Sequence, residues 1–231
     1  MTRDDDALAL AERMLGILDD GSFSATYKFA LVIALLDVCI ENTAHNGLPP
    51  SSVTTRQLAE RVLELYWSHA VPFREHGVLR QGGNHRGQQA EILRDIDDFR
   101  AMCGASGGDT LHRARLAQPG EYLRLFNRVE WKLIAMPIPR LQVLGRREDR
   151  FLYDYAWPLD VRPGTVTAYQ RGALGKFDNR LNLHPGIAEH LVRLYGLLRP
   201  LFQREWARKV ARMNDLPEAE LESFLFGADR I

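Results

Sequence analysis

Cysteine is scarce in this sequence, whose 231 residues contain only Cys39 and Cys103. Two cysteines in very different contexts exclude a disulfide-built scaffold. The absence of any CxxC pair excludes a structural zinc site made from cysteines. Lysine is scarce too, because only four of the 30 basic residues are lysines. Arginine's planar guanidinium suits phosphate groups and guanine edges, although a genome-wide preference for arginine codons gives the same composition.

Long apolar runs are also missing. The longest extends from Phe29 to Leu36 and is followed by Asp37, so it is too short to span a bilayer. Three of the first six residues are aspartates, whereas a signal peptide needs positive charge at this position. We therefore expect a cytoplasmic protein with reduced thiols and no membrane contact.

The charges that are present cancel overall but are unevenly distributed. Thirty basic residues balance 30 acidic ones, which argues against a uniformly basic nucleic-acid-binding protein. Residues 162–212, however, contain ten basic and three acidic side chains, while residues 213–231 contain one and five. The chain thus has acidic ends and a basic body.

Helical periodicity dominates the sequence. A first helix is predicted from Asp4 to Leu18, with an apolar stripe at Leu8, Ala11, Leu15 and Leu18. The next helix extends to about Asn42 and is apolar most of the way round, so we expect it at the centre of the core. A third helix is predicted at 55–67, where Thr54 and Gln57 form a capping box. Further helices are predicted at 88–102, 110–117, 185–198, 200–213 and 217–226, and one more begins at residue 121.

Strand character is confined to the middle of the chain. The apolar run 131–136 and the alternating segment 177–183 each predict a strand. Segments 141–144 and 151–155 flank the charged residues 145–150, which predicts a hairpin with a charged tip. We therefore predict a mainly α fold with a small antiparallel β-sheet or hairpin insertion around 131–183. One globular domain is expected over residues 1–214, followed by a connecting helix at 215–231.

The long polar segment 78–89 is the first candidate binding site. Three glycines at 82, 83 and 87 separate its polar side chains. Arginine, asparagine and glutamine pair bidentately with base edges, and the segment leads into a helix N-terminus, which favours anions. The expected DNA-binding residues are Arg80, Gln81, Asn84, His85, Arg86 and Gln88. The alternative is a solvated connector that binds nothing.

The predicted hairpin is the second candidate. Arg146, Arg147 and Arg150 at its tip are expected to contact phosphates, because charge without fixed geometry positions a duplex but does not specify its sequence. Tyr153 and Tyr155 lie on one side of the following strand, where they could stack on a base. Half of a buried aromatic face is the alternative explanation for this pair.

Two short patterns resemble catalytic motifs. Residues 104–108 match GxSxG, but a helix rather than a strand precedes them, so a nucleophile elbow is not predicted. Asp109 with Glu130 and Lys132 would fit a metal nuclease, in which two carboxylates hold Mg²⁺ and the lysine stabilises developing charge. This pattern is kept only as an alternative, and no catalytic residue, metal site or cofactor is otherwise expected in this chain.

Several stretches together resemble the N-terminal region of a group of bacterial HNH endonucleases. They are YKFALVIALLDVCIEN, TTRQLAERVLELYW, VLRQGG, FDNRLNLHPGI and LESFLFGADRI. Those proteins continue into an HNH module with paired cysteines for zinc and a histidine beside a catalytic metal. This chain contains neither, so the catalytic residues of that family have no counterpart here, and a divalent metal is expected only with the missing module. Lys28, which opens an apolar helix, also resembles a position in modules that read sulfur-modified DNA.

The resemblance implies a recognition domain of a restriction or defence nuclease, acting on double-stranded DNA. The basic body and arginine-rich loops favour the same function. A protein-interaction or assembly domain, which could include a homodimer, is the first alternative. A stand-alone metal-dependent nuclease is the second.

Overall fold

A computed structural model describes residues 3–19, 25–82, 88–107, 110–145, 147–173, 175 and 177–227. Helices dominate, and two small antiparallel sheets accompany them, which confirms the predicted fold class. The helices are α1 (Arg3–Asp19), α2 (Tyr27–Glu41), α3 (Thr55–His69), α4 (Glu91–Gly107), α5 (Leu111–Ala117), α6 (Pro119–Ala135), α7 (Pro137–Leu141), α8 (Pro163–Gln170), α9 (Ile187–Arg193), α10 (Tyr195–Asn214) and α11 (Glu218–Phe226). The strands are β1 (Ser52–Thr54), β2 (Val143–Leu144), β3 (Arg147–Glu148), β4 (Tyr153–Tyr155) and β5 (Arg180–Leu183).

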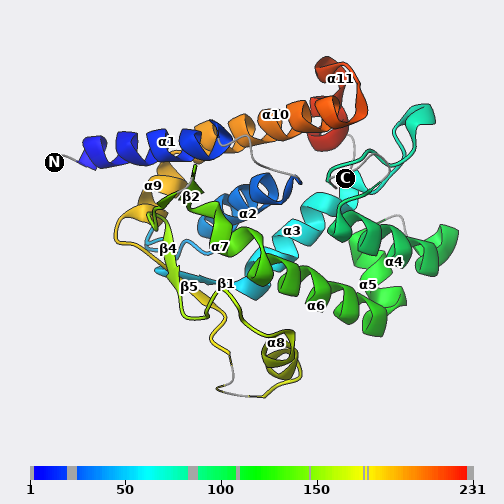
Figure 1. Cartoon of the computed structure of the whole chain (residues 1–231), viewed down its shortest axis with the longest axis horizontal. Helices are drawn as coiled ribbons and strands as arrows, with labels where there is room; N and C mark the ends of the chain where they lie inside the picture. Colours follow the sequence, from blue (N-terminus) through cyan, green and yellow to red (C-terminus); the bar gives the residue numbers. More distant parts are fainter. Residues whose placement is uncertain are drawn as a thin grey trace.

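Helix α2 forms the centre of the hydrophobic core, as its apolar circumference predicts. Every residue from Phe29 to Leu36 is buried, and α3, α7, α9 and α10 pack around the helix (Figure 1). Burying a large aliphatic or aromatic side chain contributes about 1.5–3 kcal/mol, so this one helix supplies much of the driving force for folding.

The start of α3 is fixed by the predicted capping box. The Thr54 hydroxyl accepts a hydrogen bond from the Gln57 backbone N–H over 3.2 Å, and the Thr54 N–H donates to Gln57 Oε1 over 2.8 Å. These two bonds satisfy backbone donors that the first helical turn leaves without partners. The helix therefore begins directly after β1.

The strand pairing differs from the predicted hairpin. Strand β4 pairs with β5 in a three-stranded sheet of order β1-β5-β4, while β2 pairs with β3 in a separate two-stranded hairpin. The predicted pairing of 141–144 with 151–155 is wrong because the buried Gln142 side chain takes the place of a strand. Its Oε1 accepts from the N–H groups of Leu152 and Tyr153 over 2.7 and 3.1 Å, and its Nε2 donates to the Tyr153 carbonyl over 2.9 Å.

Two other predictions in this region were wrong. The predicted strand at 131–136 is the end of α6 and the turn after it, because Phe126, Val129 and Leu133 are buried with helical spacing and continue the helix. Pro200 does not start a helix but lies inside α10. It removes a hydrogen bond to the carbonyl four residues earlier, which belongs to the exposed Gly196 and is therefore accessible to water.

Helix α1 buries a different face from the predicted one. Ala7, Leu10, Met14 and Ile17 are buried, whereas Leu8 and Leu15 are 63% and 44% exposed. Both sets have helical spacing, so periodicity alone does not distinguish them. The face that contacts α9 and α10 becomes the buried one.

The C-terminal helix α11 packs back onto α10. Leu221 and Leu225 are buried, and the Phe224 ring contacts Phe73 with centroids 4.5 Å apart. The helix expected to connect to another module therefore shares the core of this domain. Within the described residues, no helix has the length and apolar character needed to cross a membrane.

Candidate nucleic-acid interface

One face of α10 carries cations that have no acidic partner among the described residues. They are Arg204, Lys209 and Arg212. The opposite side of the helix buries Phe202, Trp206 and Val210, so Arg204 and Arg212 face outward, while Lys209 is partly buried. Positions 204, 208 and 212 follow one another at four-residue intervals, which places them on one exposed line.

The electrostatics of this face are those of adjacent like charges. Burial is the main reason why the pKa of Lys209 lies below its usual value, and the nearby Arg212 guanidinium lowers it further. Between Arg204 and Arg212, Arg208 is held by Glu205 at 2.5 Å and Glu218 at 3.2 Å. The line thus has one neutralised arginine between two available ones, which is the charge pattern that attracts a polyanion.

The polar segment 78–89 is attached to the end of the same helix. The Arg80 N–H donates to Asn214 Oδ1 over 2.9 Å, and Asn214 Nδ2 donates back to the Arg80 carbonyl over 2.8 Å. The Arg80 guanidinium donates to the Met213 carbonyl at the C-terminus of α10. The exposed Gln88 lines a cavity of about 420 Å³ together with Arg80 and Asn214. Asn84, His85 and Arg86 lie outside the described residues.

Gln81 has a structural role that sequence reasoning missed. Its side chain is 0% exposed, and its Oε1 accepts from Trp206 Nε1 over 2.7 Å and from the Thr26 hydroxyl over 3.2 Å. A side chain enclosed in this way does not reach a base edge. The expectation that Gln81 contacts DNA is therefore corrected: it joins the start of α2 to α10.

Of the three hairpin arginines, only Arg150 has a side chain in the described part of the structure. Arg150 donates to Glu148 over 2.7 Å and its guanidinium lies 5.0 Å from the centre of the Tyr155 ring. The hydrogen bond to Glu148 is the main cause that raises the pKa of Arg150 above its usual value. Arg147 belongs to β3, and Arg146 lies outside the described residues. Arg150 is thus partly neutralised before any ligand binds.

The two tyrosines belong to the core, as the alternative explanation held. Tyr153 is fully buried and its hydroxyl donates to the Ile138 carbonyl over 2.9 Å, while Tyr155 is almost fully buried. Neither ring has a face open for stacking on a base. The expected base-stacking role of Tyr153 and Tyr155 is corrected to a packing role in the sheet.

The alternative metal-nuclease pattern is not assembled. Glu130 lies on α6, not on a strand, and is fully buried. Its carboxylate oxygens already accept four hydrogen bonds, from Thr55, Tyr169, Arg56 and Gln170 at 2.7–3.3 Å, which uses the lone pairs a metal would need. Lys132 pairs with Glu91 instead, and Asp109 lies outside the described residues. No cluster of three or more metal-ligating side chains occurs in the described part of the chain.

The cations of α10 are candidate interface residues that sequence reasoning did not single out. Two signals in the sequence indicate them: the excess of basic residues in 162–212 and the spacing of Arg204, Arg208 and Arg212. What the sequence does not reveal is which arginines find acidic partners.

Comparison with known proteins gives one match. A family model described as Domain of unknown function (DUF8808) matches residues 7–225. No curated protein and no solved structure matches the chain.

Proposed function

The chain belongs to the DUF8808 family, and we propose that it is a DNA-recognition domain that binds the duplex backbone through α10. The observation that carries the proposal is the set of cations on that helix that have no acidic partner among the described residues: the exposed Arg204 and Arg212 and the partly buried Lys209. Cations that are not neutralised within the protein release counterions from DNA when they bind phosphates, and this release is the main source of affinity.

The spacing of these cations suits a duplex. Arg204 and Arg212 are eight residues apart, which corresponds to about 12 Å along a helix axis. The major groove of DNA is about 12 Å wide, so the two side chains reach phosphates on opposite sides of it. The segment that contains Arg86 begins and ends beside Asn214, at the end of this helix. Phosphate contacts along α10 would therefore bring Gln88 close to the duplex.

The wider role we propose is substrate recognition for a restriction or defence nuclease of the HNH type. The five stretches that resemble such proteins support it. In this proposal the cutting of DNA and its divalent metal belong to a separate HNH module, and the present domain supplies the affinity and the specificity.

A salt series tests the backbone contacts. Binding to a 30-base-pair duplex is measured by fluorescence anisotropy for the wild type and for the triple variant Arg204→Gln, Lys209→Gln and Arg212→Gln. Each lost phosphate contact lowers the slope of log affinity against log salt by about 0.9, so we expect a slope smaller by about 2–3 and weaker binding.

The matched control removes three exposed arginines elsewhere: Arg94→Gln, Arg140→Gln and Arg171→Gln. All three are exposed, and removing them changes the net charge by the same amount. Equal effects of the two triple variants would contradict a role for α10, since they would report net charge alone.

One observation favours a second function, in protein interaction. Leu8 and Leu15 are exposed one heptad apart on α1, which leaves an apolar edge on that helix. If this edge pairs two copies of the chain, light scattering after gel filtration will report a dimer that the Leu8→Gln and Leu15→Gln double variant converts to a monomer. A monomeric wild type would exclude this self-association.

A further inference from the structure

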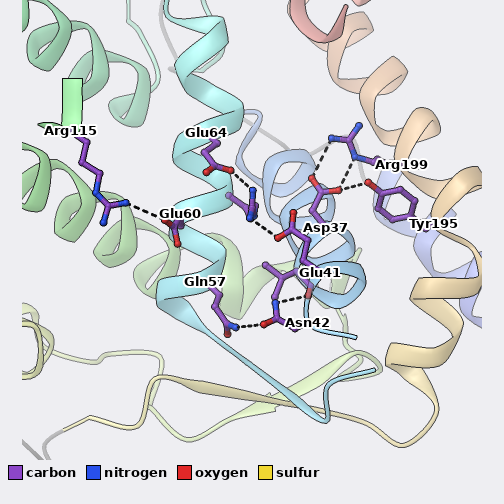
Figure 2. A network of polar contacts seen from close by, with 11 residues as sticks. Asp37, Glu41, Asn42, Gln57, Glu60, Glu64, Arg115, Tyr195 and Arg199 are labelled. Carbon is purple, nitrogen blue, oxygen red and sulfur yellow. Dashed lines mark hydrogen bonds and ion pairs between the residues drawn. The ribbon is translucent and has the colours of Figure 1, made fainter. Parts of the chain in front are cut away.

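A large cleft opens between α2, α3 and α10, on a different face of α10 from its outward cations. Its volume is about 980 Å³, which is at the upper end of the range of ligand sites in proteins. Figure 2 labels some of its polar side chains: Asp37 and Glu41 on α2, Glu64 on α3, and Tyr195 and Arg199 on α10. Leu225 and Phe226 at the end of α11 also line it, as do Arg100 on α4 and Leu111 on α5.

The wall between α2 and α10 is electrically balanced. Asp37 accepts hydrogen bonds from Arg199 Nε over 2.8 Å and from the Tyr195 hydroxyl over 2.8 Å (Figure 2). A second guanidinium nitrogen of Arg199 reaches the other carboxylate oxygen over 3.3 Å. This bidentate pair carries no net charge and fixes the geometry of the wall.

One end of the cleft has an excess of negative charge. A single arginine, Arg61, binds two carboxylates, Glu41 over 2.6 Å and Glu64 over 2.5 Å. Burial is the main cause that raises the pKa of Glu64 above its usual value, while Arg61 acts against it. One cation shared by two acids leaves one negative charge, which a bound ammonium group would balance.

The other end has one buried hydrogen-bond donor, the indole N–H of Trp67. Trp67 is 6% exposed, and its indole Nε1 has no acceptor among the described residues. The Arg100 guanidinium lies over the Trp67 ring, 4.6 Å from its centre. A buried donor without an acceptor is costly, so a ligand that brings a carboxylate to this end would gain a bond that the protein alone does not make.

We propose that this cleft binds a zwitterionic small molecule of the short-peptide class. Its ammonium group would lie beside Glu41 and Glu64, and its carboxylate beside Trp67 and Arg100. Glu64 and Trp67 are three residues apart on α3, about one helical turn or roughly 5 Å, and the side chains extend the distance further. Leu65, Val71 and Leu111 line the cleft and would pack against an apolar side chain of the peptide.

The dipeptide leucyl-leucine is the probe that tests the proposal. Its binding is measured by calorimetry and by the indole N–H signals in a proton–nitrogen correlation spectrum. The chain has four tryptophans, and the signal that Trp67→Phe removes belongs to Trp67. We expect this signal to move downfield as the peptide binds, because the indole N–H gains an acceptor.

Blocking either charge of the probe should weaken its binding to the wild-type protein. N-acetyl-leucyl-leucine lacks the ammonium group, and leucyl-leucine amide lacks the carboxylate. Each should bind about tenfold less tightly, since each loses one charge-assisted contact. If both blocked forms bind as tightly as the parent, or if leucyl-leucine leaves the Trp67 signal unmoved, the proposal is wrong.

Variants assign the two ends of the ligand. Glu64→Gln should abolish the preference for the free over the acetylated amine while leaving the preference for the free carboxylate. Arg124→Gln is the control, because Arg124 is an exposed arginine on α6 paired with Glu121, away from the cleft lining, and both preferences should persist. These peptide measurements do not depend on DNA binding. A failure of the DNA-recognition proposal would therefore leave the peptide-binding proposal untouched, and the reverse also holds.

Discussion

The indole N–H of Trp206 donates to Gln81 Oε1 over 2.7 Å, deep inside the protein. This bond links α10, which carries the outward cations, to the segment that precedes residues 83–87. The Thr26 hydroxyl donates to the same oxygen over 3.2 Å and is within 2.6 Å of the Tyr66 hydroxyl. The buried polar cluster therefore joins three helices at the base of the candidate interface.

Trp206→Phe tests the stabilising effect of this bond. The substitution removes the indole donor and some buried volume, so we expect the free energy of unfolding to fall by about 2–4 kcal/mol. Urea denaturation measures it. Trp131→Phe, at a partly buried position on α6, is the control and should cost much less. Equal losses in the two variants would mean that only ring volume matters.

Glu130→Gln is expected to destabilise the protein. The carboxylate accepts four hydrogen bonds, one of them from Arg56 over 2.9 Å, and an amide nitrogen in its place would face donors. Because Arg56 is 31% exposed, we expect a loss of about 1–3 kcal/mol, the cost of leaving buried hydrogen-bonding groups unsatisfied. Glu121→Gln, which breaks only an exposed pair with Arg124, should cost less than about 1 kcal/mol in the same urea titration.

The wild type and the Glu130→Gln variant also test for nuclease activity. We expect the wild-type chain not to cut DNA with Mg²⁺ or Mn²⁺. Metal-dependent cleavage that Glu130→Gln abolishes without loss of stability would restore the metal-nuclease hypothesis.

The two thiols should differ in reactivity. Burial raises the pKa of Cys39 to about 12, and the thiolate is the form that reacts with disulfide reagents. At pH 8 Ellman's reagent should therefore label Cys103, which is partly exposed, and should label Cys39 only after unfolding in urea. Cys103→Ser should abolish the rapid reaction in the folded protein, and Cys39→Ser should leave it unchanged.

The hairpin arginines give a prediction about non-specific affinity. Replacing Arg146, Arg147 and Arg150 by alanine should weaken binding to all duplexes alike and flatten the salt dependence. Anisotropy with two unrelated duplex sequences measures both effects. An unchanged salt slope would remove the hairpin from the interface.

Arg86 gives the complementary prediction about specificity. If it contacts a base bidentately, Arg86→Ala should cost about 1–3 kcal/mol on the preferred duplex and much less on other DNA. A selection from random duplexes identifies the preferred sequence first. Small and equal losses on both kinds of DNA would indicate a surface ion pair, which contributes little.

Local signals in the sequence were sufficient for much of the fold. The capping box of α3 and the largely apolar surface of α2 were predicted because each depends on neighbouring residues alone. Their bonds and burial agree with that expectation.

Tertiary competition explains what local signals missed. Leu8 and Ala7 lie on two helical stripes of α1 that differ only in which one meets α9 and α10. Gln142 displaces the expected strand partner of Tyr153 with a side chain. Likewise, the amide side chain of Gln81 is of the kind that pairs with base edges. Only the placement of Trp206 shows that its hydrogen bonds are made inside the protein.

The anchoring of segment 78–89 has a consequence for how this protein can diversify. Gln89 Oε1 accepts from the N–H groups of Gln81 and Ala90 over 3.0 and 2.8 Å. A side chain at Gly82 would come within 2.8 Å of Ala25, so its neighbours fix that position. These hydrogen bonds and close contacts hold the two ends of the segment, at residues 82 and 88, in place. Lengthening a closed loop adds little entropic cost, so the residues between these two positions can be exchanged without rebuilding the helices beneath.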